Sequence, residues 1–307
     1  MDKVYVIGHL NPDTDTVVAA MAMALFLNER EKTNRYVPAM TGRPNSETEY
    51  IFSRFNLTFP EVLENAQGKK LFLVDHNEPT QVVKGFQKEN ILGFVDHHKI
   101  SFDCPSPIEV TARPFGSSNT IIYGLFKKDR IKIPLSLRKA MLSAILSDTV
   151  ILKSPTTTTT DMQVVHELSA VLKIDYQDLG MELFRAKAKI AQKTPEEIIR
   201  NDFKDFDFNG KKVGIGQIEM PDLSEVMSKL PSIILKATEL KGDSGYHSII
   251  LMLTDIIKEG SRLLVVSDDP ERIEGIFGIK LRNNTSDLIP GMMSRKKQVA
   301  SVLAEKF

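Results

Sequence analysis

The chain has 307 residues, and its 40 basic side chains balance 40 acidic ones to a formal net charge of zero. This balance excludes a protein held to nucleic acid or to an anionic membrane by bulk electrostatics, so neither is expected as a partner. Hydrophobic residues at 42% and charged residues at 26% are typical of a globular protein and exclude a disordered or fibrous one.

The single cysteine, Cys104, excludes a disulfide framework and a cysteine-based zinc site, and it is typical of the reducing cytoplasm. No apolar run approaches the roughly 18 residues that a membrane-spanning helix needs. The first residues also lack the basic and apolar pattern of a signal peptide. We therefore expect a soluble cytoplasmic protein.

The first half of the sequence alternates short apolar runs with amphipathic segments. These runs predict buried strands at residues 4–8, 71–74 and 91–95. The amphipathic segments predict helices at residues 16–28 and around 81–88. This order predicts an α/β fold with a doubly wound, mostly parallel sheet, followed by helices from Asn119 to about Lys187.

The pattern changes near residue 190, where Thr194 and Pro195 are typical of the start of a new helix. Further strands are predicted at residues 212–218, 248–254 and 262–267. We therefore predict an N-terminal domain at 1–189 and a smaller α/β domain at 190–307. The five threonines at 156–160 predict a loop ahead of the next helix.

Histidines gather at the ends of the predicted strands. Four of the six lie within three residues of the end of a predicted strand, with an aspartate nearby: His9, His76, His97 and His98. Because the carboxyl ends of parallel strands share one edge of the sheet, these side chains should converge. Aspartates after strands can also form turns or cap helices, which explains Asp15 but not three such segments. The sequence therefore predicts a divalent-metal site.

Asp148 ends a helix that is predicted to begin after Pro134. A carboxylate at this end costs roughly 0.3–1 kcal/mol against the helix dipole unless a cation compensates. A solvated or capping aspartate is the alternative. Imidazole and carboxylate ligands without thiolate suit Mn, Co, Fe or Zn. Six such ligands suit two metals roughly 3.5–4 Å apart and bridged by a carboxylate.

A basic cluster, Ser294-Arg295-Lys296-Lys297-Gln298, follows Pro290 and Gly291 and opens the last predicted helix. A helix N-terminus that carries Arg and Lys suits a phosphate group. A solvated run of charges and a weak contact with nucleic acid are the alternatives for this cluster.

Together these segments resemble the DHH phosphoesterase superfamily, and most closely the family II, manganese-dependent inorganic pyrophosphatases. Four motifs carry the N-terminal resemblance: residues 9–15, 75–77, 96–98 and 142–148. The cluster at 294–298 resembles the signature of the family's C-terminal domain. The resemblance runs nearly end to end, but residues 115–120 fit it only loosely, and no role is predicted for them.

The resemblance implies a catalytic domain with two Mn²⁺ or Co²⁺ ions per subunit. One ion would be held by His9, Asp13 and Asp75. The other would be held by Asp15, Asp75, His97 and Asp148, so that Asp75 bridges the two. Asp96 would orient an imidazole, and His76 is not expected to be a ligand.

The implied reaction is hydrolysis of pyrophosphate to two orthophosphates by a water that the two metals activate, with additional Mg²⁺ accompanying the substrate. Substrate binding would fall to His98, Lys204, Arg295 and Lys296, with His98 also the catalytic hydrogen-bond or proton donor. Lys204 has little motif of its own and can equally be a surface lysine. The resemblance also implies a homodimer through the N-terminal domain and closure about a hinge near residue 190.

Three alternatives remain from the sequence. An exopolyphosphatase would use the same class of second domain. A DHH phosphodiesterase or nucleotidase would share the metal site but carry a Gly-Gly-His motif in its second domain, where residues 294–297 read Ser-Arg-Lys-Lys. A non-enzymatic metal-binding module would take up metal without releasing phosphate.

Overall fold

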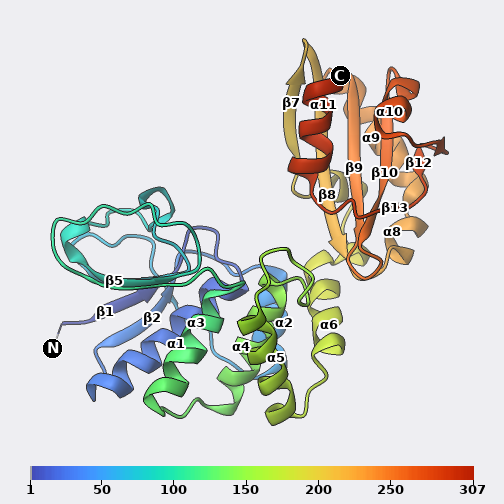
Figure 1. Cartoon of the computed structure of the whole chain (residues 1–307). Helices are drawn as coiled ribbons and strands as arrows, with labels where there is room; N and C mark the ends of the chain where they lie inside the picture. The colour runs from blue at the N-terminus through green and yellow to red at the C-terminus, as the bar shows by residue number, and fades with distance from the viewer. Residues whose placement is uncertain (1) are drawn as a thin grey trace. The chain divides into compact units, whose positions relative to one another are not determined.

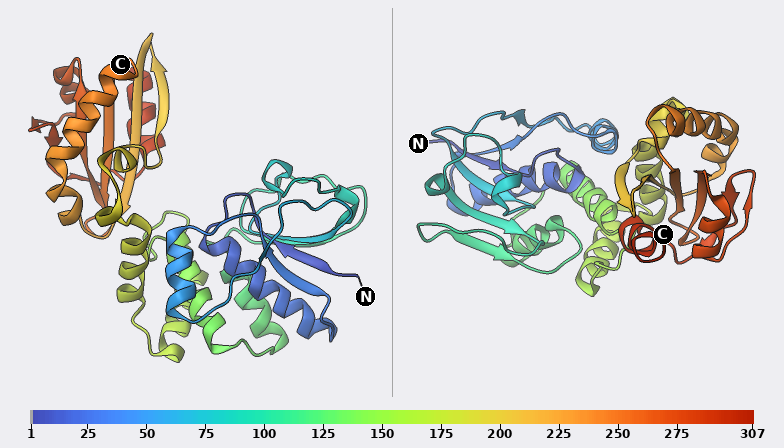
Figure 2. Two further views of the ribbon diagram at one scale, coloured as in Figure 1. Left: turned by 180° about the vertical axis from the view of Figure 1, so that it is seen from behind. Right: turned by 90° about the horizontal axis from the view of Figure 1, so that it is seen from above.

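The protein consists of two compact units, residues 1–187 and residues 188–307, in a computed structural model that describes residues 2–307 (Figures 1 and 2). The first unit is an α/β unit around a parallel sheet, and the second is a smaller α/β unit around a mixed sheet. Among residues 2–307, no helix is both long enough and apolar enough to cross a membrane.

The sheet of the first unit has six strands in the order β3-β2-β1-β4-β5-β6, and every neighbouring pair is parallel. Its strands are β1 Val4–Ile7, β2 Tyr36–Met40, β3 Glu61–Val62, β4 Lys70–Val74, β5 Ile91–Asp96 and β6 Glu109–Ala112. The central strands are apolar along their length because both faces of a parallel sheet are covered. The predicted parallel sheet is therefore confirmed.

Six helices complete this unit: α1 Thr14–Glu31, α2 Ser46–Arg54, α3 Ser118–Asp129, α4 Leu135–Asp148, α5 Thr159–Leu172 and α6 Tyr176–Ala188. Helix α1 packs on β1, β2 and β4, and it also contacts α3 and α4 on the same side of the sheet (Figure 1). The predicted run of helices after Asn119 is confirmed. Thr158 caps α5, so Thr156, Thr157 and Thr158 form the predicted loop, whereas Thr159 and Thr160 already belong to the helix.

The helix predicted around residues 81–88 is wrong. Two short 3₁₀ turns, η1 Pro79–Gln81 and η2 Lys88–Asn90, flank a non-helical segment. Gly85 in that segment has φ +73°, which a helix cannot accommodate. Val82 and Val83 are buried in a cluster with Leu71, Leu73 and Phe94 of the sheet, so their apolar pattern reflects packing of a loop.

The second unit has a seven-stranded sheet in the order β11-β12-β10-β9-β8-β7, with β13 paired to β10. Among the described strand pairs of this second sheet, β8–β9 is parallel and the others are antiparallel. The strands are β7 Lys204–Phe208, β8 Lys211–Met220, β9 Ser248–Asp255, β10 Gly260–Ser267, β11 Leu281–Arg282, β12 Thr285–Ser286 and β13 Ile289–Pro290. The three predicted strands of this half are confirmed as β8, β9 and β10.

Helices cover both faces of this sheet. The helical elements are η3 Ile190–Gln192, α7 Pro195–Ile199, α8 Ser224–Ser228, α9 Leu230–Asp243, α10 Pro270–Phe277, η4 Arg295–Ala300 and α11 Ser301–Lys306. Leu251 of β9 is buried with residues of α9, whereas its neighbour Ile250 is buried with residues of α11. Thr194 caps α7, as the sequence predicts. Element η4 begins the last helix with a π-helical turn.

Candidate metal centre

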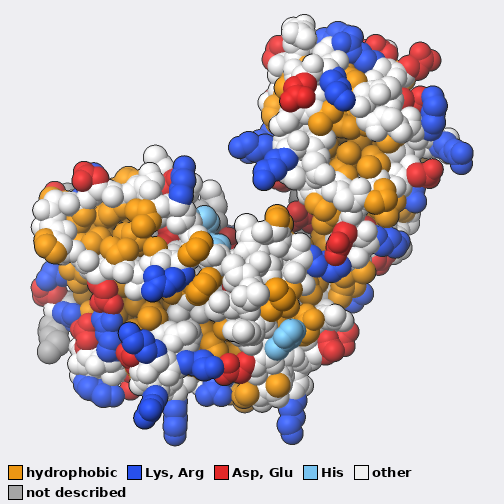
Figure 3. Space-filling view, viewed as in Figure 1, with side chains coloured by type: hydrophobic (Ala, Val, Ile, Leu, Met, Phe, Trp, Pro, Cys, Tyr) orange, Lys and Arg blue, Asp and Glu red, His pale blue; other side chains and the backbone are white. Residues whose placement is uncertain are grey.

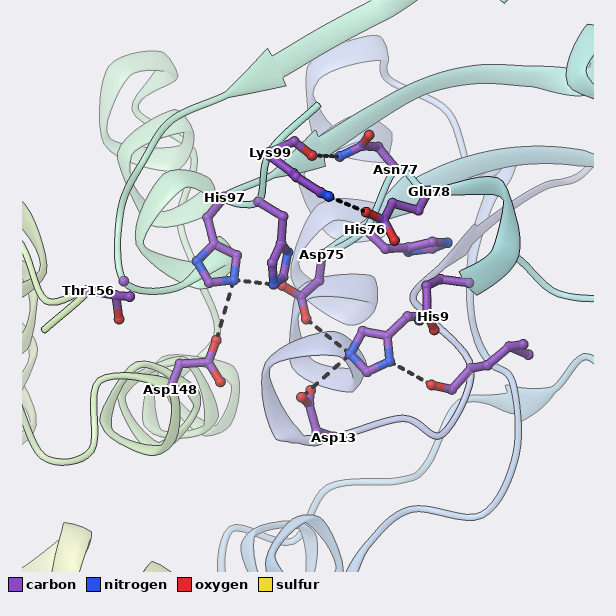
Figure 4. A pocket seen from close by; sticks show the side chains of 14 residues that line it. His9, Asp13, Asp75, His76, Asn77, Glu78, His97, Lys99, Asp148 and Thr156 are labelled. Atoms are coloured by element: carbon purple, nitrogen blue, oxygen red, sulfur yellow. Dashed lines mark hydrogen bonds and ion pairs between the residues drawn. The ribbon is translucent and has the colours of Figure 1, made fainter. Parts of the chain in front are cut away.

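The carboxyl ends of β1, β4 and β5 open into one cavity of about 710 Å³ (Figure 4). Its lining includes His9, Asp13, Asp75, His97, His98 and Asp148. All of these residues except Asp148 lie within six residues after the end of one of these strands. Asp148 is the last residue of α4. The convergence that the strand order predicts is therefore present.

His9 and Asp13 lie in the turn between β1 and α1. The Nδ1 atom of His9 is 2.8 Å from the carbonyl oxygen of Leu10, so this nitrogen donates and Nε2 is the nitrogen that faces the carboxylates. That Nε2 is 3.5 Å from Asp13 Oδ2 and 3.6 Å from Asp75 Oδ2. The other oxygen of Asp13 caps α1 by accepting a hydrogen bond from the backbone N–H of Thr16. Capping therefore fixes the orientation of this carboxylate.

Asp75 lies between His9 and His97. Its Oδ1 is 3.3 Å from His97 Nε2, while its Oδ2 faces His9 (Figure 4). Thr16 Oγ1 donates to Oδ2 of Asp75 at 2.7 Å. This close approach requires Gly8, because a Cβ atom there would lie only 2.1 Å from the Cγ2 atom of Thr16. Asp75 is thus placed where a bridging ligand would stand.

Asp15 and Asp148 complete the cluster on the side of His97. Asp15 is fully buried in the first turn of α1, and Asp148 is the last residue of α4. His97 Nε2 lies 3.7 Å from Asp148 Oδ2, and its Nδ1 lies 2.9 Å from the carbonyl oxygen of Phe115.

The six predicted metal residues form two groups that share Asp75. Within each group the possible ligand atoms lie within 4.8 Å of one another. One group is His9, Asp13 and Asp75, and the other is Asp15, Asp75, His97 and Asp148. Such a spacing of imidazole and carboxylate atoms suits divalent ions of the Mn, Co, Fe or Zn kind.

Crowding of the carboxylates shifts the pKa values of the cluster. Burial and the charge of Asp75 raise the pKa of Asp15 to about 7, and burial and Asp15 raise that of Asp148 well above its usual range. Burial alone would lower the pKa values of His9 and His97, but the neighbouring carboxylates raise both to about 9. Without metal the cluster therefore attracts protons, which is the behaviour of a site built for cations.

His98 differs from the residues of the two groups because it is more exposed and forms a hydrogen bond with Asp96. Its side chain is 54% exposed, and its Nδ1 lies 2.8 Å from Asp96 Oδ1, which also accepts from the backbone N–H of His98. Asp96 is fully buried and accepts a further hydrogen bond from Asn77. Although His98 lies within ligand distance of Asp75 and His97, this arrangement leaves its Nε2 available to a ligand in the cavity.

His76 is buried and uncharged. Its Nδ1 lies 2.8 Å from the carbonyl oxygen of Val74, and burial lowers its pKa to about 4. Within residues 2–307, His76 belongs to none of the ligand groups.

Sequence reasoning gave no role to residues that contact the cluster most closely. Thr16, Ser117, Ser118 and Asn119 donate hydrogen bonds to Asp15 or Asp75. The only signal in the sequence is a run of small polar residues ahead of α3, which is also the usual pattern of a helix start.

The predicted substrate residues of the second unit lie on β7 and η4. Lys204 is exposed at the start of β7, and Lys296 is exposed in the first turn of η4. Arg295 is 8% exposed, and its backbone N–H donates to the side chain of Gln217 on β8. Gln298 accepts hydrogen bonds from the backbone N–H groups of Met293 and Ser294, which fixes the turn before η4.

Comparisons with known proteins cover both units. Residues 3–147 match the DHH family, N-terminal domain, and residues 181–306 match the DHHA2 domain. The manganese-dependent inorganic pyrophosphatase of Methanocaldococcus jannaschii is 41% identical over 312 residues, with 99% of each chain covered. That of Methanothrix thermoacetophila is 41% identical over 309 residues, covering 100% of this chain and 99% of the relative.

A solved structure of a family II inorganic pyrophosphatase is also similar to this chain. The crystal structure from Methanococcus jannaschii that is assigned to the family II inorganic pyrophosphatases superposes with a TM-score of 0.67 at 41% identity. It covers 99% of both chains. With its DHH and DHHA2 domains, the chain therefore belongs to the manganese-dependent inorganic pyrophosphatase family.

Proposed function

We infer that this chain hydrolyses inorganic pyrophosphate to two orthophosphates in a manganese-dependent reaction. The observation that carries this inference is the pair of ligand groups that share Asp75 at the carboxyl edge of the parallel sheet. Full-length relatives at about 41% identity are named for this activity and this metal.

Two divalent ions, Mn²⁺ or Co²⁺, fit the residues present. His9, Asp13 and Asp75 would hold one ion, and Asp15, Asp75, His97 and Asp148 the other. Two divalent ions would neutralise the four carboxylates, which otherwise share protons in a largely buried cluster. Bound ions of this kind supply a water of lowered pKa and polarise phosphoryl oxygens.

Pyrophosphate would be bound by cationic side chains and by His98. Asp96 orients the His98 imidazole so that Nε2 can donate a hydrogen bond or a proton to the leaving phosphate. Arg295 and Lys296 at the start of η4, and Lys204 on β7, would offset the phosphate charge. Mg²⁺ bound to the substrate would offset more of it. The first domain, residues 1–189, would thus hold the metals, and the second, residues 190–307, would bind substrate.

We further propose that the chain is a cytoplasmic homodimer joined at β6. This strand is one edge of the sheet, and edge strands offer unpaired backbone groups to a partner. Val110 on β6 is 47% exposed and Ile100 is 62% exposed. Figure 3 shows hydrophobic side chains gathered on the face of the first unit over the segment between β4 and β6. Val110→Lys should give a monomer by light scattering, while Val171→Lys on α5 should stay dimeric.

The activity is tested by phosphate release after chelation and reloading with Mn²⁺, Co²⁺, Zn²⁺ or Mg²⁺. Pyrophosphate, tripolyphosphate and a 3′-phosphorylated nucleotide are compared as substrates. Fast release from pyrophosphate alone, highest with Mn²⁺ or Co²⁺, is expected. Preference for tripolyphosphate would mean an exopolyphosphatase, preference for the nucleotide a nucleotidase, and metal uptake without release a binding module.

A further inference from the structure

Helix α3 begins against the metal-ligand cluster, in the segment for which the sequence predicts no role. Ser117, Ser118, Asn119 and Thr120 are all buried, with at most 1% of their surface exposed. Ser117 caps α3, and the first backbone N–H groups of this 12-residue helix point toward the cluster. Four buried polar side chains in a row need hydrogen-bond partners, and carboxylates supply them.

Asp15 receives most of the donors. Its Oδ1 accepts from the hydroxyl of Ser117, from the side-chain amide of Asn119 at 2.8 Å and from the backbone N–H of Asn119 at 3.4 Å. Its Oδ2 accepts from the backbone N–H of Ser118 at 2.8 Å. The Asn119 amide also donates to the backbone carbonyl of Asp15 at 3.1 Å. Both oxygens of this carboxylate are therefore fixed in direction.

Asp75 accepts fewer hydrogen bonds than Asp15, and they come from other groups. The hydroxyl of Ser118 donates to Oδ1 at 2.8 Å, and that of Thr16 donates to Oδ2 at 2.7 Å. Ser118 therefore contacts both carboxylates, by its backbone to Asp15 and by its hydroxyl to Asp75. Asn119, in contrast, contacts only Asp15 of the two.

Asp161 anchors both ends of this segment by hydrogen bonds. Its carboxylate accepts hydrogen bonds from the backbone N–H of Gly116 at 2.8 Å and from Thr120 Oγ1 at 2.6 Å. It also accepts from the backbone and the hydroxyl of Thr158 at the start of α5. Both ends of the segment are thus tied to one fully buried carboxylate, so the donors are held in place independently of a metal.

We propose that Ser117, Ser118 and Asn119 are positioning residues that orient two of the metal ligands unequally. Asn119 and Ser117 act on Asp15 alone, and hence on the ion held with His97 and Asp148. The Ser118 hydroxyl acts on Asp75, and hence on both ions. This inference rests on the proposed two-metal function. Partners that orient a metal ligand typically change metal affinity by about 10- to 100-fold when they are removed.

Titration of the metal-free full-length chain with Mn²⁺ alone tests this inference. The free ion is followed by electron paramagnetic resonance, which reports the number and affinity of bound ions without any turnover. For Asn119→Ala, we expect one ion to bind as in the wild type and the other to bind about 10- to 100-fold more weakly. For Ser118→Ala, we expect both ions to bind more weakly. Ser143→Ala removes a buried hydroxyl of α4 that donates to the backbone oxygen of Lys139, and this variant should bind two ions normally.

Ser117→Ala provides a second test if Asn119→Ala fails to fold, because it removes one hydroxyl that donates to Asp15. It should reproduce the selective loss of one ion. The inference is overturned if Asn119→Ala or Ser117→Ala weakens the binding of both ions equally. It is also overturned if both of these variants bind two ions with wild-type affinity. Failure of the proposed function would be distinct, since the wild-type chain itself would then bind fewer than two ions or release no phosphate from pyrophosphate.

Discussion

The guanidinium of Arg295 lies 3.1 Å from the carboxylate of Asp202, with Nη1 facing Oδ2. The two groups form an ion pair without the alignment of a hydrogen bond, so Nη1 has no acceptor among the described residues. Arg295 is largely buried, whereas the carboxylate of Asp202 is 58% exposed. Asp202 therefore pairs with the charge of Arg295 without satisfying the hydrogen-bonding capacity of Nη1.

Asp202→Asn should raise the KM for pyrophosphate and leave kcat nearly unchanged, because the arginine loses the charge that orients it. A partly exposed ion pair contributes little free energy to holding the arginine, so we expect KM to rise by up to about fivefold. Steady-state kinetics at saturating Mn²⁺ measure the effect. Glu196→Gln, which removes exposed ion pairs with Arg200 and Lys236 in the same unit, serves as the control and should leave KM unchanged. A lower KM for Asp202→Asn would instead mean that Asp202 competes with the substrate.

Asp13→Ala should reduce turnover by orders of magnitude without unfolding the chain. Asp13 both caps α1 and belongs to the ligand group of His9, so the variant loses a ligand and about 1 kcal/mol of helix capping. Asn45→Ala removes the matching cap of α2, where the side chain accepts from Thr48 N at 2.8 Å. The two variants should melt at similarly reduced temperatures, but only Asn45→Ala should keep its activity. Near-normal turnover of Asp13→Ala at saturating Mn²⁺ would refute its assignment as a ligand.

Metal binding should release protons near neutral pH. The pKa values of His9 and His97 are raised to about 9 without metal, whereas a metal binds the neutral imidazole. At pH 7.5 both rings are therefore protonated, and loading with Mn²⁺ should displace at least two protons per chain, to which the raised pKa values of Asp15 and Asp148 add. A pH indicator in weakly buffered solution measures this release. Mn²⁺ affinity should accordingly rise with pH up to about 9, and a flat affinity between pH 7 and 9 would contradict the raised pKa values.

The same groups predict how the stability of the metal-free chain depends on pH. A histidine whose pKa rises from 6.5 to about 9 on folding stabilises the folded state fully below pH 6.5, and this contribution is lost as the pH rises to 9. The raised pKa of Asp15 acts in the same direction at lower pH, between its usual range and about 7. Urea unfolding of the metal-free chain should therefore show decreasing stability from pH 6.5 to 9, and an increase would contradict the prediction.

The central strands could be predicted from sequence because both of their faces are covered, so they are apolar throughout. Strand β2 was not predicted, since Pro38 interrupts its pattern, and strand β6 was not predicted, since Glu109 and Thr111 make it polar at the edge of the sheet. Edge position and pairing are properties of the whole fold. They cannot be predicted from the few residues that form one strand.

The ligand cluster could be predicted because strand ends bring His9, Asp75 and His97 together by topology alone. The residues that donate hydrogen bonds to Asp15 could not be predicted in this way. Ser117 and Asn119 have the pattern of an ordinary helix cap, and their contact with Asp15 spans more than 100 positions of the chain. Which carboxylate a capping residue faces depends on tertiary packing, so only the structure identifies these residues as part of the site.

The turn after Asp148 has an unusual backbone. Val150, Ile151 and Leu152 all have positive φ, at 49°, 54° and 65°, which is most costly for the β-branched Val150 and Ile151. Ile151 is buried against α6 at Gly180, where a Cβ atom would lie 2.7 Å from its Cγ1. The absence of a side chain at Gly180 therefore makes room for this strained turn.

Gly180→Ala should lower the free energy of unfolding by about 1–3 kcal/mol, because overpacking must displace Ile151. Gly124→Ala on the exposed face of α3 is the matched control, since its new Cβ would meet no atom within 4 Å beyond its chain neighbours and the backbone of α3. There the gain in helix propensity should raise the free energy of unfolding by about 1 kcal/mol. Urea denaturation of the two variants gives both values. If both were stabilised alike, Ile151 would have to move away at little cost, and the turn that follows Asp148 would not be held by α6.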